Sequence, residues 1–189
     1  MEGEKSMLEE FIPLRKVDIQ SFIKFNNQLK EILDRLDKNT IFEENFYSEE
    51  SYKKLIKSFV TNQRDSLGNT TFGSWSLVPN DKQMDSDSRV DFIFMPTYLV
   101  TAILSRTLCD FPFLVESIPD YKDALKKGLL FCSYRNLEGH GYERDSGAAE
   151  ALKILSLGKV PFILEQDKDL CPPLYKVIKD VSQYIQHRI

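Results

Sequence analysis

The chain has 189 residues, 42% of them hydrophobic and 29% charged, a composition typical of a folded globular protein and not of a disordered one. This length is sufficient for one domain with a substantial core and short for two. The formal net charge is −4, and Lys and Arg are scattered along the chain. The sequence therefore predicts no basic surface for DNA or RNA.

No apolar run approaches the roughly 20 residues that a helix needs to cross a bilayer. The first ten residues, MEGEKSMLEE, are more polar and acidic than a secretory signal. We therefore expect a cytoplasmic protein that does not associate with membranes. The three cysteines, Cys109, Cys132 and Cys171, are widely separated and form no CxxC pair. This pattern favours free, buried thiols over disulfides or a zinc site.

The predicted elements are helices. Asp18 is placed to cap a helix over 19–36, in which apolar residues recur every three or four positions. Ser48 begins a second helix, with Glu49 and Glu50 in its first turn, where negative charge complements the helix dipole. The expected apolar faces are Phe22, Phe25, Leu29, Ile32, Leu33 and Leu36 in the first helix, and Tyr52, Leu55, Ile56, Phe59 and Val60 in the second.

A long irregular loop is expected at about 65–91, which is rich in Gly, Ser, Asn and Asp and has no helical period. Loops of this length inside a compact domain are usually functional or disordered. Only 74–78 has a strand-like pattern within it. A helix then follows with Pro96 in its first turn. It is apolar around most of its circumference, which predicts a buried helix.

Prolines and a glycine divide the rest of the chain. Pro112 and Pro119 interrupt it, and Asp120 begins a helix over about 121–134. Asp145 or Ser146 can cap another helix, for which we expect Leu157 as the last residue and Gly158 as the stop signal. Pro161 is expected to interrupt the next apolar run.

The motif CPP at 171–173 begins a C-terminal helix that reaches about His187. Tyr184, Ile185 and Ile189 add apolar residues beyond those that one face requires, so we expect a homodimer through this helix. The predicted class is all-α, a single helical domain over 1–189 built from antiparallel helical hairpins. Within it, the N-terminal segment 1–17 is expected to be flexible.

Two parts of the chain are similar to each other. YKKLIKSFV at 52–60 and YKDALKKGLL at 121–130 share aromatic, lysine and apolar positions in step. Each is followed by a loop that combines glycine with an aromatic residue, GSW at 73–75 and GHGY at 139–142, and then by a helix rich in Ala and Leu. The repeating unit is thus a helix, a glycine-aromatic loop and a buried helix.

At these motifs the chain resembles the hairpins of the α/α toroids, which include terpenoid cyclases, prenyltransferase β-subunits and six-hairpin glycosidases. The resemblance covers about 52–158. It implies hairpins around a shared centre with loops at one rim, and this length allows a partial toroid or a dimer that completes one. DSDS at 85–88 supplies two of the three carboxylates in the cyclase motif Asp-x-Asp-Asp. No Asp, Cys and His set of the prenyltransferase zinc site is identifiable, so the resemblance carries architecture and no catalytic residue.

RNLEGHGYERDSG, at 135–147, is the first candidate site. It can present His140 with Glu138 or Glu143 as acid and base, since histidine titrates nearest neutral pH. It can equally be a tight turn between two helices, with Tyr142 packed beneath His140, and this alternative is the more common one. The same choice applies to Trp75, the only tryptophan, which can contact a ligand or anchor its loop.

The expected ligand contacts are Trp75, Tyr98, Arg135 and Tyr142, and no metal or cofactor site is expected. Asp85 and Asp87 match only the start of an EF-hand loop, and GxGxxG, P-loop, HExxH and GxSxG motifs are absent. A dyad of Cys132 with His140 would need a thiol that the surrounding apolar residues are expected to bury.

Two functions remain. The first is a non-catalytic protein that binds a small-molecule ligand or a partner in a groove rimmed by the Trp75 and His140 loops. The alternative is an enzyme of the α/α-toroid type that acts on a carbohydrate or polyprenyl-like substrate. Its acid and base would come from Glu138, His140, Glu143 or Asp91.

Overall fold

The computed structural model describes residues 8–13, 18–64, 72–77, 93–137 and 148–186. All regular secondary structure in these ranges is helical, which confirms the all-α class, and the strand-like pattern at 74–78 yields no strand within its described residues. The helices are α1 (Ile19–Asp37), α2 (Glu49–Asn62), α4 (Met95–Asp110), α5 (Pro112–Val115), α6 (Tyr121–Leu137), α7 (Ala148–Leu157), α8 (Val160–Gln166) and α9 (Pro172–Gln186).

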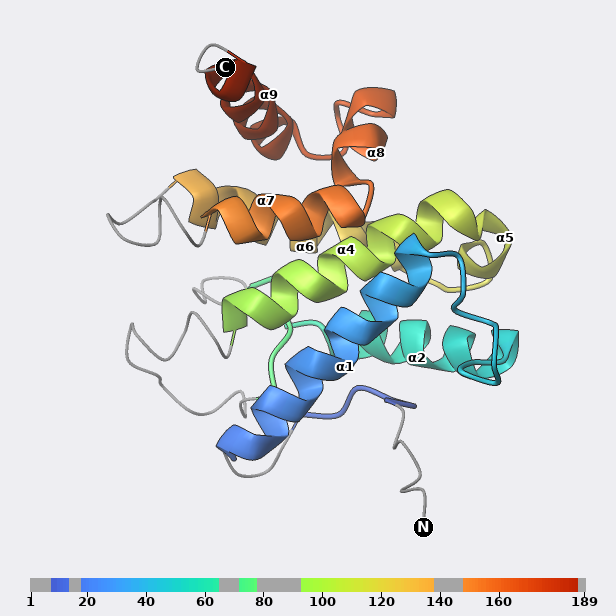
Figure 1. Ribbon diagram of the computed structural model, residues 1–189. Coiled ribbons are helices and arrows are strands. Elements are labelled where there is room, and N and C mark those ends of the chain that lie inside the picture. Colours follow the sequence, from blue (N-terminus) through green and yellow to red (C-terminus); the bar gives the residue numbers. More distant parts are fainter. Residues whose placement is uncertain (1–7, 14–17, 65–71, 78–92, 138–147, 187–189) are drawn as a thin grey trace.

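Helix α4 is the central element. It packs against α1, α5, α6, α7 and α8, and Figure 1 shows it running between α1 and α7. Every side chain from Pro96 to Thr107 is buried, which confirms the expectation of a helix covered on all sides. The Thr107 hydroxyl on α4 is satisfied within the helix, since it donates to the Ile103 carbonyl at 2.7 Å, whereas the buried Ser105 hydroxyl has no hydrogen-bond partner among the described residues. None of the described helices is both long and apolar enough to cross a membrane.

The first two helices begin where the sequence predicts. The Asp18 carboxylate accepts a hydrogen bond from the Gln20 amide at 3.1 Å, and Ser48 and Ser51 form a reciprocal capping box. Both predicted apolar faces turn inward, except that Val60 is only half-buried. Val60 lines a surface cleft described below.

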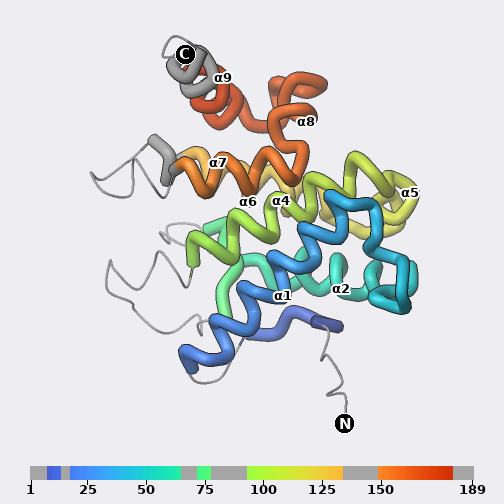
Figure 2. The backbone as a smooth tube through the Cα atoms, viewed as in Figure 1, coloured from blue at the N-terminus to red at the C-terminus, as the bar shows by residue number. Residues whose placement is uncertain are grey.

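The N-terminal segment, which the sequence suggests is flexible, lies against α2 over residues 8–13 (Figure 2). Phe11 is fully buried, and its amide donates to the Ser58 hydroxyl at 2.7 Å. The Asn62 side chain donates to the Phe11 carbonyl at 2.9 Å. These contacts attach this part of the segment to the helical core.

The two tyrosines that begin the similar segments both reach the same end of α4. Tyr52, on α2, shares a hydrogen bond of 2.6 Å with the Thr107 hydroxyl, and Tyr121, on α6, donates to the Leu104 carbonyl at 2.5 Å. Burial raises the pKa of both phenols well above the usual value. The repeat itself stays a prediction, because its second loop lies outside the described residues.

Helix α7 ends at the expected residue, but for a different physical reason than the sequence suggests. Helix α7 does end at Leu157, but Lys159, with φ 56°, takes the left-handed conformation, and Gly158 does not. Gly158 is needed for space, because a Cβ there would lie 2.5 Å from Ala102 Cα. The prediction that Pro161 interrupts the chain is wrong, since it lies in the first turn of α8, where its missing amide hydrogen costs no hydrogen bond.

A network of ion pairs connects the end of α4 to α1 and to the junction of α7 and α8. Arg106, on α4, donates to Asp110 at 2.5 Å and to Asp37, at the end of α1, at 3.1 Å. It also donates to the Leu157 carbonyl at 3.1 Å, and Lys159 pairs with Asp110 at 2.5 Å. The buried guanidinium therefore joins α1, α4 and the α7–α8 junction.

The close contact at Gly158 gives a test of the packing. We expect Gly158→Ala to lower the free energy of unfolding by about 2–3 kcal/mol, since the added methyl group would push α7 away from α4. Urea denaturation followed by circular dichroism measures this change. Ser156→Ala, at an exposed position of α7 two residues earlier, is the control and should change stability by less than about 0.5 kcal/mol. Equal stability of the two variants would contradict the assigned contact.

Candidate functional site

The four residues predicted to be catalytic, and one predicted ligand contact, lie outside the described residues. They are Asp91, Glu138, His140, Glu143 and Tyr142. Arg135 is part of α6, but its side chain is also outside the described set. Catalysis by the loop at 135–147 therefore stays a prediction.

Trp75 is the first described residue of the predicted ligand set, and it is fully buried. Its indole nitrogen donates to the Phe59 carbonyl of α2 at 2.7 Å. Its amide donates to the Thr97 hydroxyl of α4 at 3.0 Å. These bonds anchor the segment 72–77 between two helices. Of the two roles that the sequence leaves open for Trp75, they agree with the one in which it anchors its loop. A ligand contact for Trp75 stays a prediction.

The glycines near Trp75 are required by close approaches. Gly73 has φ 78°, and a Cβ on it would lie 2.5 Å from the Lys127 carbonyl oxygen. A Cβ on Gly128 would lie 2.7 Å from Thr101 Oγ1 and 2.8 Å from the Trp75 ring. The segment 72–77 is thereby pressed onto α6.

Tyr98 and Cys132 are also enclosed. Tyr98 belongs to the buried core cluster, at 7% exposure, and it does not line either of the two concavities described below. Cys132 is fully buried and lies 3.8 Å from Thr101 Oγ1. Burial raises the pKa of the Cys132 thiol. A buried thiol with a raised pKa is a poor nucleophile, as the sequence suggests.

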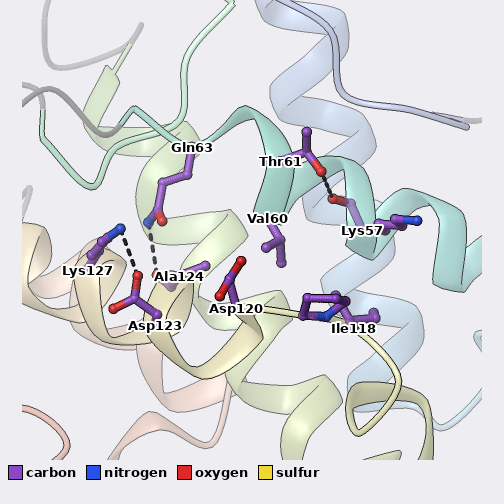
Figure 3. Close-up of a pocket in the computed structure, with 10 residues that line it drawn as sticks. Lys57, Val60, Thr61, Gln63, Ile118, Asp120, Asp123, Ala124 and Lys127 are labelled. Carbon is purple, nitrogen blue, oxygen red and sulfur yellow. Dashed lines mark hydrogen bonds and ion pairs between the residues drawn. The ribbon is translucent and has the colours of Figure 1, made fainter.

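A cleft opens between the C-terminal half of α2 and the start of α6, which Figure 3 shows in close-up. Its volume is about 420 Å³. No sequence motif indicates this cleft, because its residues come from separate segments of the chain. The lining consists of Lys57, Val60, Thr61, Gln63, Ile118, Pro119, Asp120, Asp123, Ala124 and Lys127.

Gln63 has a fixed orientation at one side of this cleft. Its amide nitrogen donates to the Gly73 carbonyl at 3.0 Å and to the Ala124 carbonyl at 2.9 Å. Only the NH₂ group can donate to two carbonyls, so these bonds determine which end of the amide is which. The Oε1 atom accepts no hydrogen bond from any described residue. It is therefore available as an acceptor.

Asp120 lies just before α6, with φ 60°. Figure 3 shows its carboxylate standing in the cleft and pointing toward α2. Within the described parts of the chain, no hydrogen bond or ion pair reaches this carboxylate. Asp123, one turn later, is different, because it pairs with Lys127 at 2.7 Å. Asp120 is thus the carboxylate of the cleft that still lacks a described partner.

A second concavity, the α1–α7 groove, has a volume of about 490 Å³. Leu33, Leu99, Ile154 and Leu157 give it an apolar lining. Charged residues on its two rims face each other, and Lys30 and Glu150 approach to 3.9 Å across it. The rim charges of this groove therefore compensate one another in part.

No group of three or more His, Cys, Asp or Glu side chains in the described ranges is arranged to hold a metal ion. Compared with protein-family models, curated proteins and solved structures, the chain matches none of them. The site must accordingly be interpreted from its own chemistry.

Trp75 gives a direct test of anchoring against ligand contact. We expect Trp75→Phe to lower the free energy of unfolding by about 2–3 kcal/mol, because it removes a buried hydrogen bond and leaves a cavity. Phe162→Leu, at an exposed aromatic side chain, is the control and should have little effect in the same urea titration. Unchanged stability together with loss of ligand binding would instead assign Trp75 to a binding site.

Proposed function

We propose that the protein is a non-catalytic binding protein that holds a small polar ligand in the α2–α6 cleft. The observation that carries this proposal is the carboxylate of Asp120, which faces a concave surface without a described partner. A charged group in such a place is a ready contact for a ligand. The fixed Oε1 atom of Gln63 adds a second polar contact.

The size and the walls of the cleft support a ligand of low molecular mass. Its volume of about 420 Å³ falls within the range of about 300–1,000 Å³ that is usual for small-molecule sites. Ile118, Pro119 and Ala124 provide apolar wall, and Val60 is half-buried beside them. The site thus combines apolar surface with a few oriented polar groups.

The described groups favour binding over catalysis. General acid–base chemistry needs two titratable groups placed on the reacting atoms. In the cleft, Asp123 is held by Lys127, and the Gln63 amide does not titrate. Lys57 points away from the middle of the cleft (Figure 3), which leaves Asp120 as the one described carboxylate of the lining without a partner. The alternative, an enzyme of the toroid type, depends on His140 and its neighbours, and it remains an alternative.

The cleft is also the better candidate than the α1–α7 groove. The groove has more apolar surface, but its rim charges lie opposite each other, as Lys30 and Glu150 do at 3.9 Å. A ligand that enters the groove would find charges already compensated. A ligand that enters the cleft would find the Asp120 carboxylate without a described partner.

Filling the cleft tests the proposal. Fragments of low mass, both charged and neutral, are screened against the full chain by amide chemical shifts in NMR. We expect hits to shift the amides of Val60, Gln63, Asp120 and Ala124. Val60→Phe should weaken these hits at least about tenfold by occupying the cleft, while stability changes by less than about 1.5 kcal/mol.

Val177→Phe is the matched control, because Val177 is also half-buried on a helix, α9, and lies outside the cleft. It should leave fragment binding unchanged. Hits whose shifts map only to the α1–α7 groove, or that bind Val60→Phe as well as the original chain, would contradict the proposed function.

A further inference from the structure

We propose that the α2–α6 cleft selects a ligand that carries a protonated amine or a guanidinium group. The cationic group would pair with the Asp120 carboxylate and donate a further hydrogen bond to Gln63 Oε1. This inference rests on the proposed function, since it names the chemical class of the ligand for the same site.

Apart from the ammonium groups of Lys57 and Lys127, the polar side chains that line the cleft have acceptors to spare and few donors. Gln63 uses its NH₂ group on the Gly73 and Ala124 carbonyls, which leaves its oxygen for a ligand. The Thr61 hydroxyl donates to the Lys57 carbonyl at 2.9 Å. The remaining capacity for hydrogen bonds is therefore mainly that of an acceptor, which suits a ligand rich in N–H groups.

The two lysines of the lining do not neutralise Asp120. Lys127 is bound to Asp123 at 2.7 Å, and its ammonium also lies 5.8 Å from the centre of the Phe72 ring. The ammonium of Lys57 points away from the middle of the cleft in Figure 3. The negative charge of Asp120 is thus left for a cation from outside.

The backbone explains why Asp120 faces the cleft. A residue just before a helix usually turns its carboxylate onto the first amides of that helix. Asp120 has φ 60° instead of the extended conformation of a capping residue, and none of the described hydrogen bonds joins its side chain to α6. In Figure 3 its carboxylate is directed toward Val60 of α2, and Gln63 follows directly after the end of this helix.

The apolar wall suits the carbon chain of such a ligand. Val60, Ile118, Pro119 and Ala124 line the same cleft. An ammonium or guanidinium on a short alkyl chain can place its charge at Asp120 and its methylene groups on this wall. A free alkylamine and the side chain of a lysine or arginine in a peptide have this chemistry in common.

The first experiment compares three probes of similar size, n-butylammonium, n-butylguanidinium and neutral 1-pentanol, by NMR titration of the full chain at neutral pH. We expect both cations to shift the amides of Gln63 and Asp120 and to bind at least about tenfold more tightly than 1-pentanol. Raising the salt concentration should weaken the cations and leave the alcohol unchanged.

Asp120→Asn is the decisive variant. Asparagine tolerates the left-handed backbone as well as aspartate does, so the fold should be kept while the charge is lost. We expect its affinity for n-butylammonium to fall about tenfold. Glu116→Gln removes the same charge from an exposed neighbouring position outside the cleft, and it should change the affinity less than about twofold.

The outcomes separate the two proposals. Equal binding of 1-pentanol and the cations, blocked by Val60→Phe, would overturn the cationic class and leave the cleft as the ligand site. Cations that bind without shifting the cleft amides, or no binding by any probe, would overturn the inference. N-acetyl-lysine methylamide distinguishes the sources, because stronger binding than n-butylammonium indicates a peptide side chain and weaker binding a free amine.

Discussion

The close approach of neighbouring chain segments to α4 is the constraint on which the rest of the structure depends. A buried helix whose whole circumference is covered needs neighbours that come near, and small residues permit this. Gly158 admits Ala102 at a distance that no Cβ would allow, and Gly128 does the same for Thr101 and the Trp75 ring. A side chain at position 158 would push α7 away from α4, and a side chain at position 128 would push α6 away. The buried Arg106 then links three of these elements by hydrogen bonds.

The position of α6 against α4 in turn creates the cleft. Gly73 lets the segment 72–77 lie on the Lys127 carbonyl, and this brings the Gly73 carbonyl within reach of Gln63. Gln63 also binds the Ala124 carbonyl of α6, so one side chain connects the end of α2, the Trp75 segment and α6. The cleft is thus walled by elements that are fixed to one another, which lowers the entropic cost of ordering a site when a ligand binds.

Periodicity and capping residues were sufficient to predict the longer helices, but not the short helices α5 and α8 or the site. Asp18 and Ser48 begin α1 and α2 as expected, because capping is local and is encoded within a few residues. Gly158 shows the limit, since the boundary was right but the cause, contact with Ala102, is tertiary. The cleft could not be found in this way. It depends on the direction of the Asp120 carboxylate and on the approach of Gln63, which lies 57 positions earlier in the sequence, and no local spacing records either.

The carboxylate of Asp120 is the part of this arrangement that folding does not explain. Its backbone conformation would suit asparagine or glycine equally well, so the left-handed φ of 60° does not require a charge. The described contacts use only its backbone carbonyl, which accepts the Ala124 amide at 2.9 Å. A carboxylate that no described group stabilises contributes little to the folded state through pairing. Asp120 is exposed, so water can solvate this carboxylate in the free protein, and its place in the lining of the cleft suits a cation that arrives with the ligand.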